Sequence, residues 1–294
     1  MLASCFGGGG SSDPTPTPTP TGTPTPSPTP SPTPTPTQVD FDFAKAFTAI
    51  ASNSSFIYAY FAPTGGPEVW SDGSPQNGLS KLTYTVSPDS AAFSWPDTAT
   101  LMTFGAADLQ TSTPTRRVYR KGTDALTLEL PFHNVLLASY ERAESYVRET
   151  VAGTLRSNRV TIFFNPPTTT SAITSNLTYT GTAQVVGGKP GTTPPGVFTA
   201  DATTLTVTAS DKKIAGTIRI YENVSGVRTL RAVLPISATT ATNGVFSGDI
   251  NDTANGFKGK FVGSLAGATR QEVFLVFDVA HTDGRELLGS LIGG

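Results

Sequence analysis

Residues 214–221 read IAGTIRIY, an alternation typical of a β-strand with one buried and one solvent-facing side. Ile214 and Ile218 fall on one face, while Thr217 and Arg219 fall on the other. A helix would instead repeat its apolar residues every three to four positions. The stretch therefore predicts an antiparallel strand, and similar segments follow each other along the second half of the chain.

Eight such segments are predicted, each separated from the next by a break of hairpin length such as Asn223–Gly226. The strands are expected near 177–186, 197–208, 213–221, 227–236, 244–250, 257–265, 271–280 and 286–292. Glycines within 257–265 permit the tight coiling that a small barrel needs. We therefore predict an all-β fold in which residues 166–294 form an eight-stranded antiparallel up-and-down β-barrel.

The first half is less regular and predicts a smaller β-rich, handle-like domain over residues 38–165. Strand-like pieces stand at 55–61, 81–86, 126–132 and 159–164. Apolar residues near helical spacing predict one short helix in 39–51, and 140–148 fits either a helix or a strand. The segment Asn165-Pro166-Pro167-Thr168 marks the expected domain boundary.

The N-terminal segment predicts an anchor and a stalk. Leu2-Ala3-Ser4-Cys5 resembles the bacterial lipobox, so residues 1–5 are interpreted as the end of a signal peptide and Cys5 as the lipidation site. Residues 6–37 are a Gly/Ser tether followed by alternating Thr-Pro and Ser-Pro. Such a repeat has little to bury and stays extended and disordered, reaching roughly 70 Å at full length. A membrane is therefore a predicted partner, through the lipid anchor.

Composition excludes several function classes. The 20 Lys and Arg nearly balance the 22 Asp and Glu, which argues against a nucleic-acid partner. The chain lacks the sequence motifs of hydrolases, phosphate loops and dinucleotide sites, so no enzyme activity is expected. No metal site and no cofactor are predicted, with a haem or iron complex at His133 or His281 as the open alternative.

An aromatic cluster in the first half is the best candidate for a partner-binding surface. Tyr58, Tyr60, Phe61 and Trp70 lie close together in sequence, and Tyr and Trp are enriched at interface hot spots. The competing interpretation places alternate members of the cluster in the handle core.

The second half also resembles a known family. Residues 174–183 (TSNLTYTGTA), 214–218 (IAGTI) and the closing Gly259-Lys260-Phe261-Val262-Gly263 are similar to the β-barrel domain of transferrin-binding protein B and its relatives. The match covers 160–294 well and 38–160 poorly, and its glycine and aromatic positions concern the fold more than the ligand. Val262-Gly263-Ser264 departs from the family's aromatic-Gly-Pro pattern.

The resemblance implies a surface-exposed outer-membrane lipoprotein of a Gram-negative bacterium. It would bind a solute or carrier protein, with iron or haem as one option, beside a TonB-dependent transporter. Export by a surface-lipoprotein translocator is implied as well. The alternative function is a structural or adhesive cell-surface lipoprotein with no small ligand.

Overall fold

The fold is described by a computed structural model for residues 40–98, 101–194 and 196–294. Gln38–Gly294 form one compact unit. All regular elements of the described residues are strands apart from one 3₁₀ turn, η1 (Ala106–Asp108), so the predicted all-β class is confirmed. The predictions for Cys5 and for the 6–37 linker lie outside the described residues.

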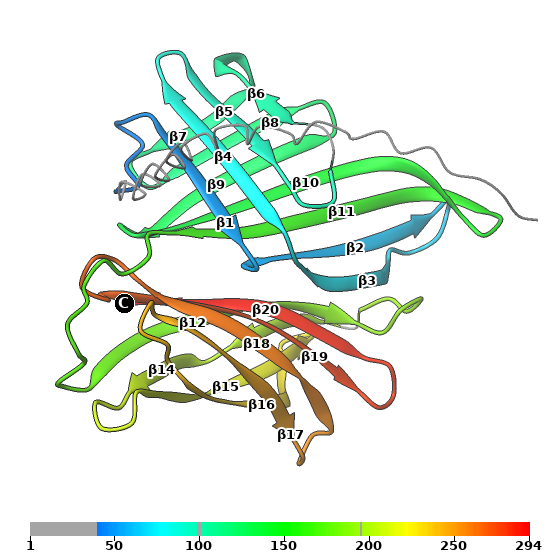
Figure 1. The fold of residues 1–294 in the computed structure, drawn as a ribbon. Helices are drawn as coiled ribbons and strands as arrows, with labels where there is room; N and C mark the ends of the chain where they lie inside the picture. The colour runs from blue at the N-terminus through cyan, green and yellow to red at the C-terminus, as the bar shows by residue number, and fades with distance from the viewer. Residues whose placement is uncertain (1–39, 99–100, 195) are drawn as a thin grey trace, which may run out of the picture. The chain divides into compact units, whose positions relative to one another are not determined.

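The strands form three antiparallel sheets (Figure 1). The four-stranded sheet has the order β1-β4-β5-β6, with β1 (Phe47–Ser52), β4 (Leu79–Val86), β5 (Asp89–Ser94) and β6 (Met102–Phe104). The seven-stranded sheet has the order β3-β2-β11-β10-β9-β8-β7, with β2 (Ser55–Pro63), β3 (Val69–Gln76), β7 (Leu109–Thr113), β8 (Arg116–Lys121), β9 (Asp124–Phe132), β10 (Val135–Arg148) and β11 (Val151–Phe164).

The nine-stranded sheet contains all remaining strands. Its order is β13-β15-β14-β12-β20-β19-β18-β17, and β16 pairs with β15. The strands are β12 (Leu177–Gly188), β13 (Val197–Ala200), β14 (Ala202–Val207), β15 (Lys213–Val224), β16 (Val227–Thr239), β17 (Val245–Asp252), β18 (Phe257–Ala266), β19 (Glu272–His281) and β20 (Glu286–Gly293). The predicted strand 197–208 is thus divided at Asp201, and each predicted barrel strand is present.

A closed barrel is not detected among the described strands. Most neighbouring strands in sequence pair, but β13 pairs with β15 and not with β12 or β14. β12, the first strand of this sheet, pairs with β20, the last. Among the described residues, however, β16 and β17 share no backbone ladder, so the sheet is rolled but open. At this seam the side chain of Asp252 accepts the Val233 backbone N–H at 2.6 Å. A side chain therefore bonds a backbone donor that a neighbouring strand would bond in a closed barrel.

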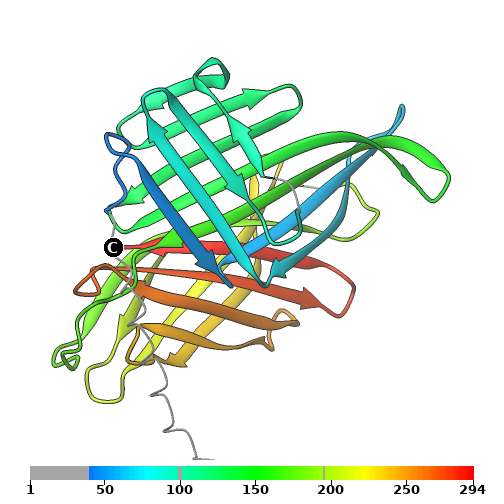
Figure 2. The same ribbon diagram turned by 45° about the horizontal axis from the view of Figure 1, so that its top comes forward.

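β10 illustrates how the sheets are layered. Its first half, VLLASY over 135–140, is buried at nearly every residue. Leu136 and Tyr140 pack in the cluster shared with the four-stranded sheet, while Val135 and Leu137 pack against residues of the nine-stranded sheet. A strand covered on both faces needs apolar residues throughout, not in alternation. Beyond Tyr140 the strand becomes polar, and the β10–β11 hairpin projects past the four-stranded sheet (Figure 2).

The helix predicted for 39–51 is wrong. β1 begins at Phe47, and its burial alternates strictly between buried Phe47, Ala49 and Ala51 and exposed neighbours. Upstream, Phe41 and Phe43 enter the same core cluster without forming a helix. The undecided segment 140–148 is strand, because it belongs to β10.

The segment that follows β11 separates the sheets in sequence. The seven-stranded sheet ends at Phe164 and the nine-stranded sheet begins at Leu177. The domain boundary at 165/166 stays a prediction, because the whole of Gln38–Gly294 forms one compact unit.

Candidate ligand-binding site

A cavity of about 310 Å³ opens at one end of the nine-stranded sheet, and we call it the mouth cavity. It is lined by Gly188, Lys189, Thr192, Thr193, Phe198, Glu222, Arg231, Phe257, Asp283, Arg285, Glu286 and Leu287. These residues come from β12, β13, β15, β16, β18 and β20, near the strand ends, and from the turns beside them. The volume falls at the lower end of the range for small-molecule sites, about 300–1,000 Å³.

Glu222 reaches the cavity because it continues an inward-facing row of β15. Ile218 and Ile220 are fully buried in the core of the rolled sheet, and Glu222 lies two residues further on. Its side chain is only 5% exposed. A carboxylate at such a depth needs a hydrogen-bonded cationic partner, since burial of an unpaired charge is costly.

Arg231 provides that partner through an irregularity in the neighbouring strand. The β15–β16 register shifts between Ile220 and Tyr221, whose partners are Ala232 and Leu230, so Arg231 is the extra residue of a bulge. Bulges commonly redirect a side chain beside a functional site. Arg231 Nε lies 2.8 Å from Glu222 Oε2. Within the described residues this is the one side-chain hydrogen bond of either residue, which leaves unused hydrogen-bonding capacity at the cavity.

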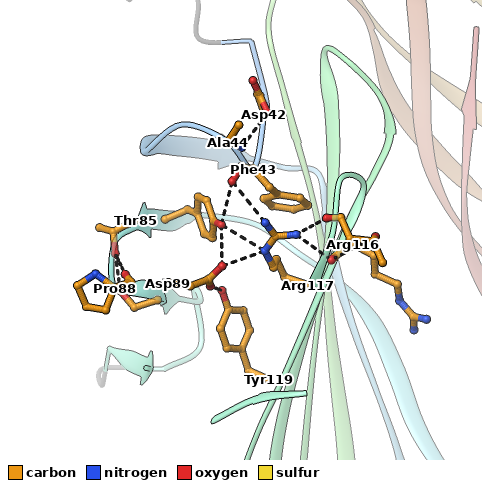
Figure 3. A network of polar contacts seen from close by, with 12 residues as sticks. Asp42, Phe43, Ala44, Thr85, Pro88, Asp89, Arg116, Arg117 and Tyr119 are labelled. Carbon is orange, nitrogen blue, oxygen red and sulfur yellow. Dashed lines mark hydrogen bonds and ion pairs between the residues drawn. The ribbon is translucent and has the colours of Figure 1, made fainter. Parts of the chain in front are cut away.

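Another arginine–carboxylate pair, Arg117 with Asp89, is saturated, in the sense that further protein groups take up the hydrogen-bonding capacity of both side chains (Figure 3). Arg117 Nε lies 3.0 Å from Asp89 Oδ2, and the guanidinium also donates to the carbonyls of Thr113, Arg116 and Phe43. This network joins β8, the β4–β5 hairpin and the segment before β1.

Two tyrosines complete the Asp89 site. The Tyr84 hydroxyl lies 3.0 Å from Asp89 Oδ2, and the Tyr119 hydroxyl donates to Asp89 Oδ1. Burial, followed by the hydrogen bond to Asp89, raises the pKa of both tyrosines, so their hydroxyls keep the protons they donate. None of these residues lines the mouth cavity. The Asp89–Arg117 pair therefore acts as a structural clamp.

The other wall of the mouth cavity combines an aromatic ring with a second ion pair. Phe257 is buried, and the guanidinium carbon of Arg285 lies 5.8 Å from its ring centroid. Arg285 Nε donates to Asp283 Oδ2 at 2.8 Å. Desolvation opposes the ionisation of Asp283, but hydrogen bonds from Arg285 and His281 lower its pKa to about 2. Asp283 is thus ionised and matched to Arg285.

Trp70 fixes the turn that carries Lys189 and Thr192. Its backbone N–H donates to the Thr192 carbonyl at 2.9 Å, and its carbonyl accepts from the Gly191 N–H at 2.8 Å. Its indole Nε1 donates to Glu286 Oε2 at 3.2 Å. A Cβ on Gly188 would lie 2.6 Å from Trp70, so a glycine is needed for this approach. The seven-stranded sheet therefore positions one rim of the mouth cavity.

The predicted aromatic cluster is largely internal. Trp70 is 0% and Phe61 is 4% exposed, while Tyr58 and Tyr60 are half-buried. Tyr58 stacks on Trp70 with centroids 6.1 Å apart, and Tyr60 meets it edge-on at 5.3 Å. Burial raises the pKa of Tyr58 to about 12. Direct contact of these four residues with a partner stays a prediction. The contacts seen place Tyr58 and Tyr60 against Trp70, and Phe61 against Tyr146.

Sequence reasoning missed Glu222 and Arg231. The available signal was an acidic residue that continues the apolar row of Ile218 and Ile220. Arg231 carried no signal, because a bulge depends on pairing with another strand.

The remaining candidates do not assemble a site. His133 is exposed, and His281 pairs with Asp283 at 2.7 Å. In the described part of the chain, no group of three His, Cys, Asp or Glu could hold a metal ion. A larger cavity, of about 540 Å³ beside His133, is lined mainly by exposed or half-buried residues. Its one ion pair, Asp42 with Lys45, is exposed.

No helix of the described residues is both long and apolar enough to span a membrane.

Comparison with known proteins gives structural matches only. No protein-family model matches the chain. No curated protein matches it significantly. Transferrin-binding protein B from serogroup B Neisseria meningitidis is similar at 12% identity and a TM-score of 0.45, over 81% of this chain and 43% of that one.

Two further solved structures of transferrin-binding protein B are similar. A double mutant from Haemophilus parasuis has 11% identity and a TM-score of 0.41, over 83% of this chain and 59% of that one. A mutant from Actinobacillus pleuropneumoniae has 10% identity and a TM-score of 0.39, over 82% and 100%. This chain thus spans less than two thirds of the first two proteins. The predicted resemblance to transferrin-binding protein B is thus found among solved structures.

Proposed function

We propose that this chain is a surface-tethered binding protein that captures a small ligand in the mouth cavity. The observation that carries the proposal is the Glu222–Arg231 pair: Glu222 is buried, Arg231 is half-buried, and both line the cavity with unused hydrogen-bonding capacity. Folded proteins satisfy nearly all buried polar groups. A ligand whose polar groups match these free donors and acceptors supplies the missing hydrogen bonds.

The tether is the second part of the proposal. Cys5 carries the lipid, and residues 6–37 space the folded unit from the outer membrane of a Gram-negative bacterium. The resemblances of the lipobox and of the barrel motifs support this arrangement. They also favour export of the protein by a surface-lipoprotein translocator. At the surface, the protein would deliver a solute, or a carrier protein with iron or haem, to a TonB-dependent transporter. Two acyl chains suffice for stable anchoring.

The anchor is tested by metabolic labelling with an alkyne fatty acid in cells that express the full chain. We expect label on the wild type and on Ser12→Ala, and none on Cys5→Ser, which should also leave the membrane fraction. Equal label on Cys5→Ser would contradict the anchor.

The cavity is tested by a blocking variant. Thr193 is an exposed lining residue with no side-chain hydrogen bond among the described residues, so Thr193→Trp fills the mouth without removing an internal contact. Thr178→Trp, also exposed but at the opposite end of β12, is the matched control. In a ligand-observed NMR screen of small molecules, we expect hits that Thr193→Trp weakens at least tenfold and Thr178→Trp leaves unchanged. A screen without any such hit would overturn the proposal.

One observation favours the adhesive alternative. Tyr146, Val147 and Val151, beside the turn of the β10–β11 hairpin, are 45%, 60% and 49% exposed. Adjacent apolar residues at an exposed tip are typical of a contact surface. This alternative expects Val147→Ser with Val151→Ser to reduce cell attachment while Thr193→Trp does not. Unchanged attachment in the double variant would eliminate it.

A further inference from the structure

Two of the three carboxylates at the mouth cavity are already matched. Glu222 is paired with Arg231 and Asp283 with Arg285, each at 2.8 Å. Glu286 accepts the indole N–H of Trp70. Its pKa is raised, first by burial and then by the nearby charge of Asp72, against the lowering effect of the Trp70 hydrogen bond. Glu286 is therefore the one carboxylate of the three that has no cationic partner among the described residues.

The positive groups are less completely used. Lys189 forms no ion pair with any described residue and lies on the rim. Arg231 and Arg285 each reach their carboxylate through Nε. Their Nη groups have no partner among the described side chains and carbonyls, although a guanidinium has five N–H donors. Unused donors thus outnumber unused acceptors at the cavity.

The apolar part of the wall lies beside these donors. Phe257 and Leu287 belong to the core of the rolled sheet, and Phe198 packs against it. The Arg285 guanidinium near the Phe257 ring joins the two kinds of surface. A flat apolar group can cover these side chains while an acidic group on the same molecule meets the donors.

We propose that the mouth cavity selects a small organic anion, in which a flat apolar body carries a carboxylate, sulfonate or phosphate. The body lies against Phe198, Phe257 and Leu287, and the acidic group accepts hydrogen bonds from Lys189 and Arg231. Arginine forks suit such groups because two parallel N–H donors match two oxygens. This inference rests on the proposed function, since it names the ligand class of the same cavity.

Two probes with the same aromatic body separate charge from apolar contact. 1-Anilinonaphthalene-8-sulfonate is an anion, and N-phenyl-1-naphthylamine is its neutral analogue. Each is titrated by fluorescence into the full chain and its variants Lys189→Gln, Lys258→Gln and Thr193→Trp. Lys258 is an exposed lysine of β18 outside the cavity lining, so Lys258→Gln removes the same charge elsewhere.

We expect the sulfonate to bind at least tenfold more tightly than the neutral analogue. Lys189→Gln should weaken sulfonate binding three- to tenfold, Lys258→Gln should leave it unchanged, and Thr193→Trp should abolish it. Raising the ionic strength should weaken the sulfonate but not the neutral probe, because salt screens exposed charge.

The outcomes that overturn the inference differ from those that overturn the proposed function. If both probes bind equally, Thr193→Trp removes both and Lys189→Gln affects neither, the cavity is a binding site without selection for anions. If Thr193→Trp leaves both probes bound, they bind elsewhere and the ligand class assigned to the cavity is wrong; the wider screen described above then decides the function.

Discussion

Asp89–Arg117 and Glu222–Arg231 are arginine–carboxylate pairs in which one side chain is buried and the other half-buried, with N–O distances of 3.0 and 2.8 Å. Asp89 also receives two tyrosine hydroxyls, and Arg117 also donates to three carbonyls. Glu222 and Arg231 have only each other among the described residues and face a cavity. The difference teaches that burial of a charged pair does not reveal its role. Its unused hydrogen-bonding capacity is more informative, because a saturated pair has nothing to offer a ligand.

The largest effect should come from breaking the saturated pair. Arg117→Met leaves Asp89 without its cation and removes one hydrogen bond from each of three carbonyls. We therefore expect a loss of about 3–5 kcal/mol in the free energy of unfolding. Urea denaturation measures it. The neighbouring Arg116→Met is the control, because the Arg116–Glu129 pair is exposed and contributes at most about 1 kcal/mol. Equal losses in both variants would contradict the clamp.

The next largest loss of stability should come from a change at Trp70, which supports the rim of the mouth cavity. Trp70→Phe keeps a buried ring and the backbone bonds to Gly191 and Thr192, but removes the hydrogen bond to Glu286. We expect a loss of about 1–3 kcal/mol from the lost bond and the smaller side chain. Faster hydrogen exchange at the Gly191 amide, with no change at amides of β4, would show that the effect is local. Uniformly faster exchange would argue against a specific role at the rim.

Glu222→Gln should change two properties in opposite directions, lowering stability and raising the affinity for the sulfonate. Arg231 is 34% exposed and can turn to water, so we expect a loss of only about 1–2 kcal/mol in stability. Because the variant frees the Arg231 guanidinium, the naphthalene sulfonate should bind several-fold more tightly. Asp89→Asn, the equivalent change in the saturated pair, should destabilise the protein without changing sulfonate affinity. Weaker sulfonate binding by Glu222→Gln would contradict the proposed role of Arg231.

The smallest effect is a pH dependence at Glu286. Its pKa is higher in the folded protein than the ordinary value, chiefly through burial. As pH rises through the window between these values, the unfolded chain loses its proton first, so the contribution of Glu286 to stability falls. Glu286→Gln should therefore gain stability relative to wild type as the pH rises above the ordinary glutamate pKa of about 4, by less than about 1 kcal/mol. Urea midpoints measure it, with exposed Glu144→Gln as control; parallel pH profiles of Glu286→Gln and wild type would refute it.

The strands of the rolled sheet could be predicted because each has one buried and one wet face. In β15 the alternation of Ile214, Ile218 and Ile220 with polar residues records that geometry directly. β3 was missed because its sequence, VWSDGSPQ, is polar and contains Gly and Pro. Gly73 is there for a contact distant in sequence: a Cβ would lie 2.6 Å from Leu288 and 2.9 Å from Trp70. The local sequence pattern gives no signal of such close packing between distant segments.

The candidate site was less predictable than the fold, for the same reason. The four aromatic residues looked like a surface because their burial depends on sheets that meet only in the folded chain. Arg231 reaches Glu222 through a bulge, and at the β16–β17 seam the side chain of Asp252 accepts a hydrogen bond from the Val233 backbone of the other strand. Each of these features arises from the pairing of strands, which one-dimensional periodicity does not specify.

The most direct test of the account is to locate the bound anion by NMR. The full chain, labelled with ¹⁵N, is titrated with 1-anilinonaphthalene-8-sulfonate, and the amide shifts are mapped onto the sequence. The account predicts that the largest perturbations fall at Lys189, Glu222, Phe257 and Arg285, and that the amides of Asp89 and Arg117 do not move. Perturbations centred on Asp89 and Arg117, or spread evenly over the chain, would contradict it.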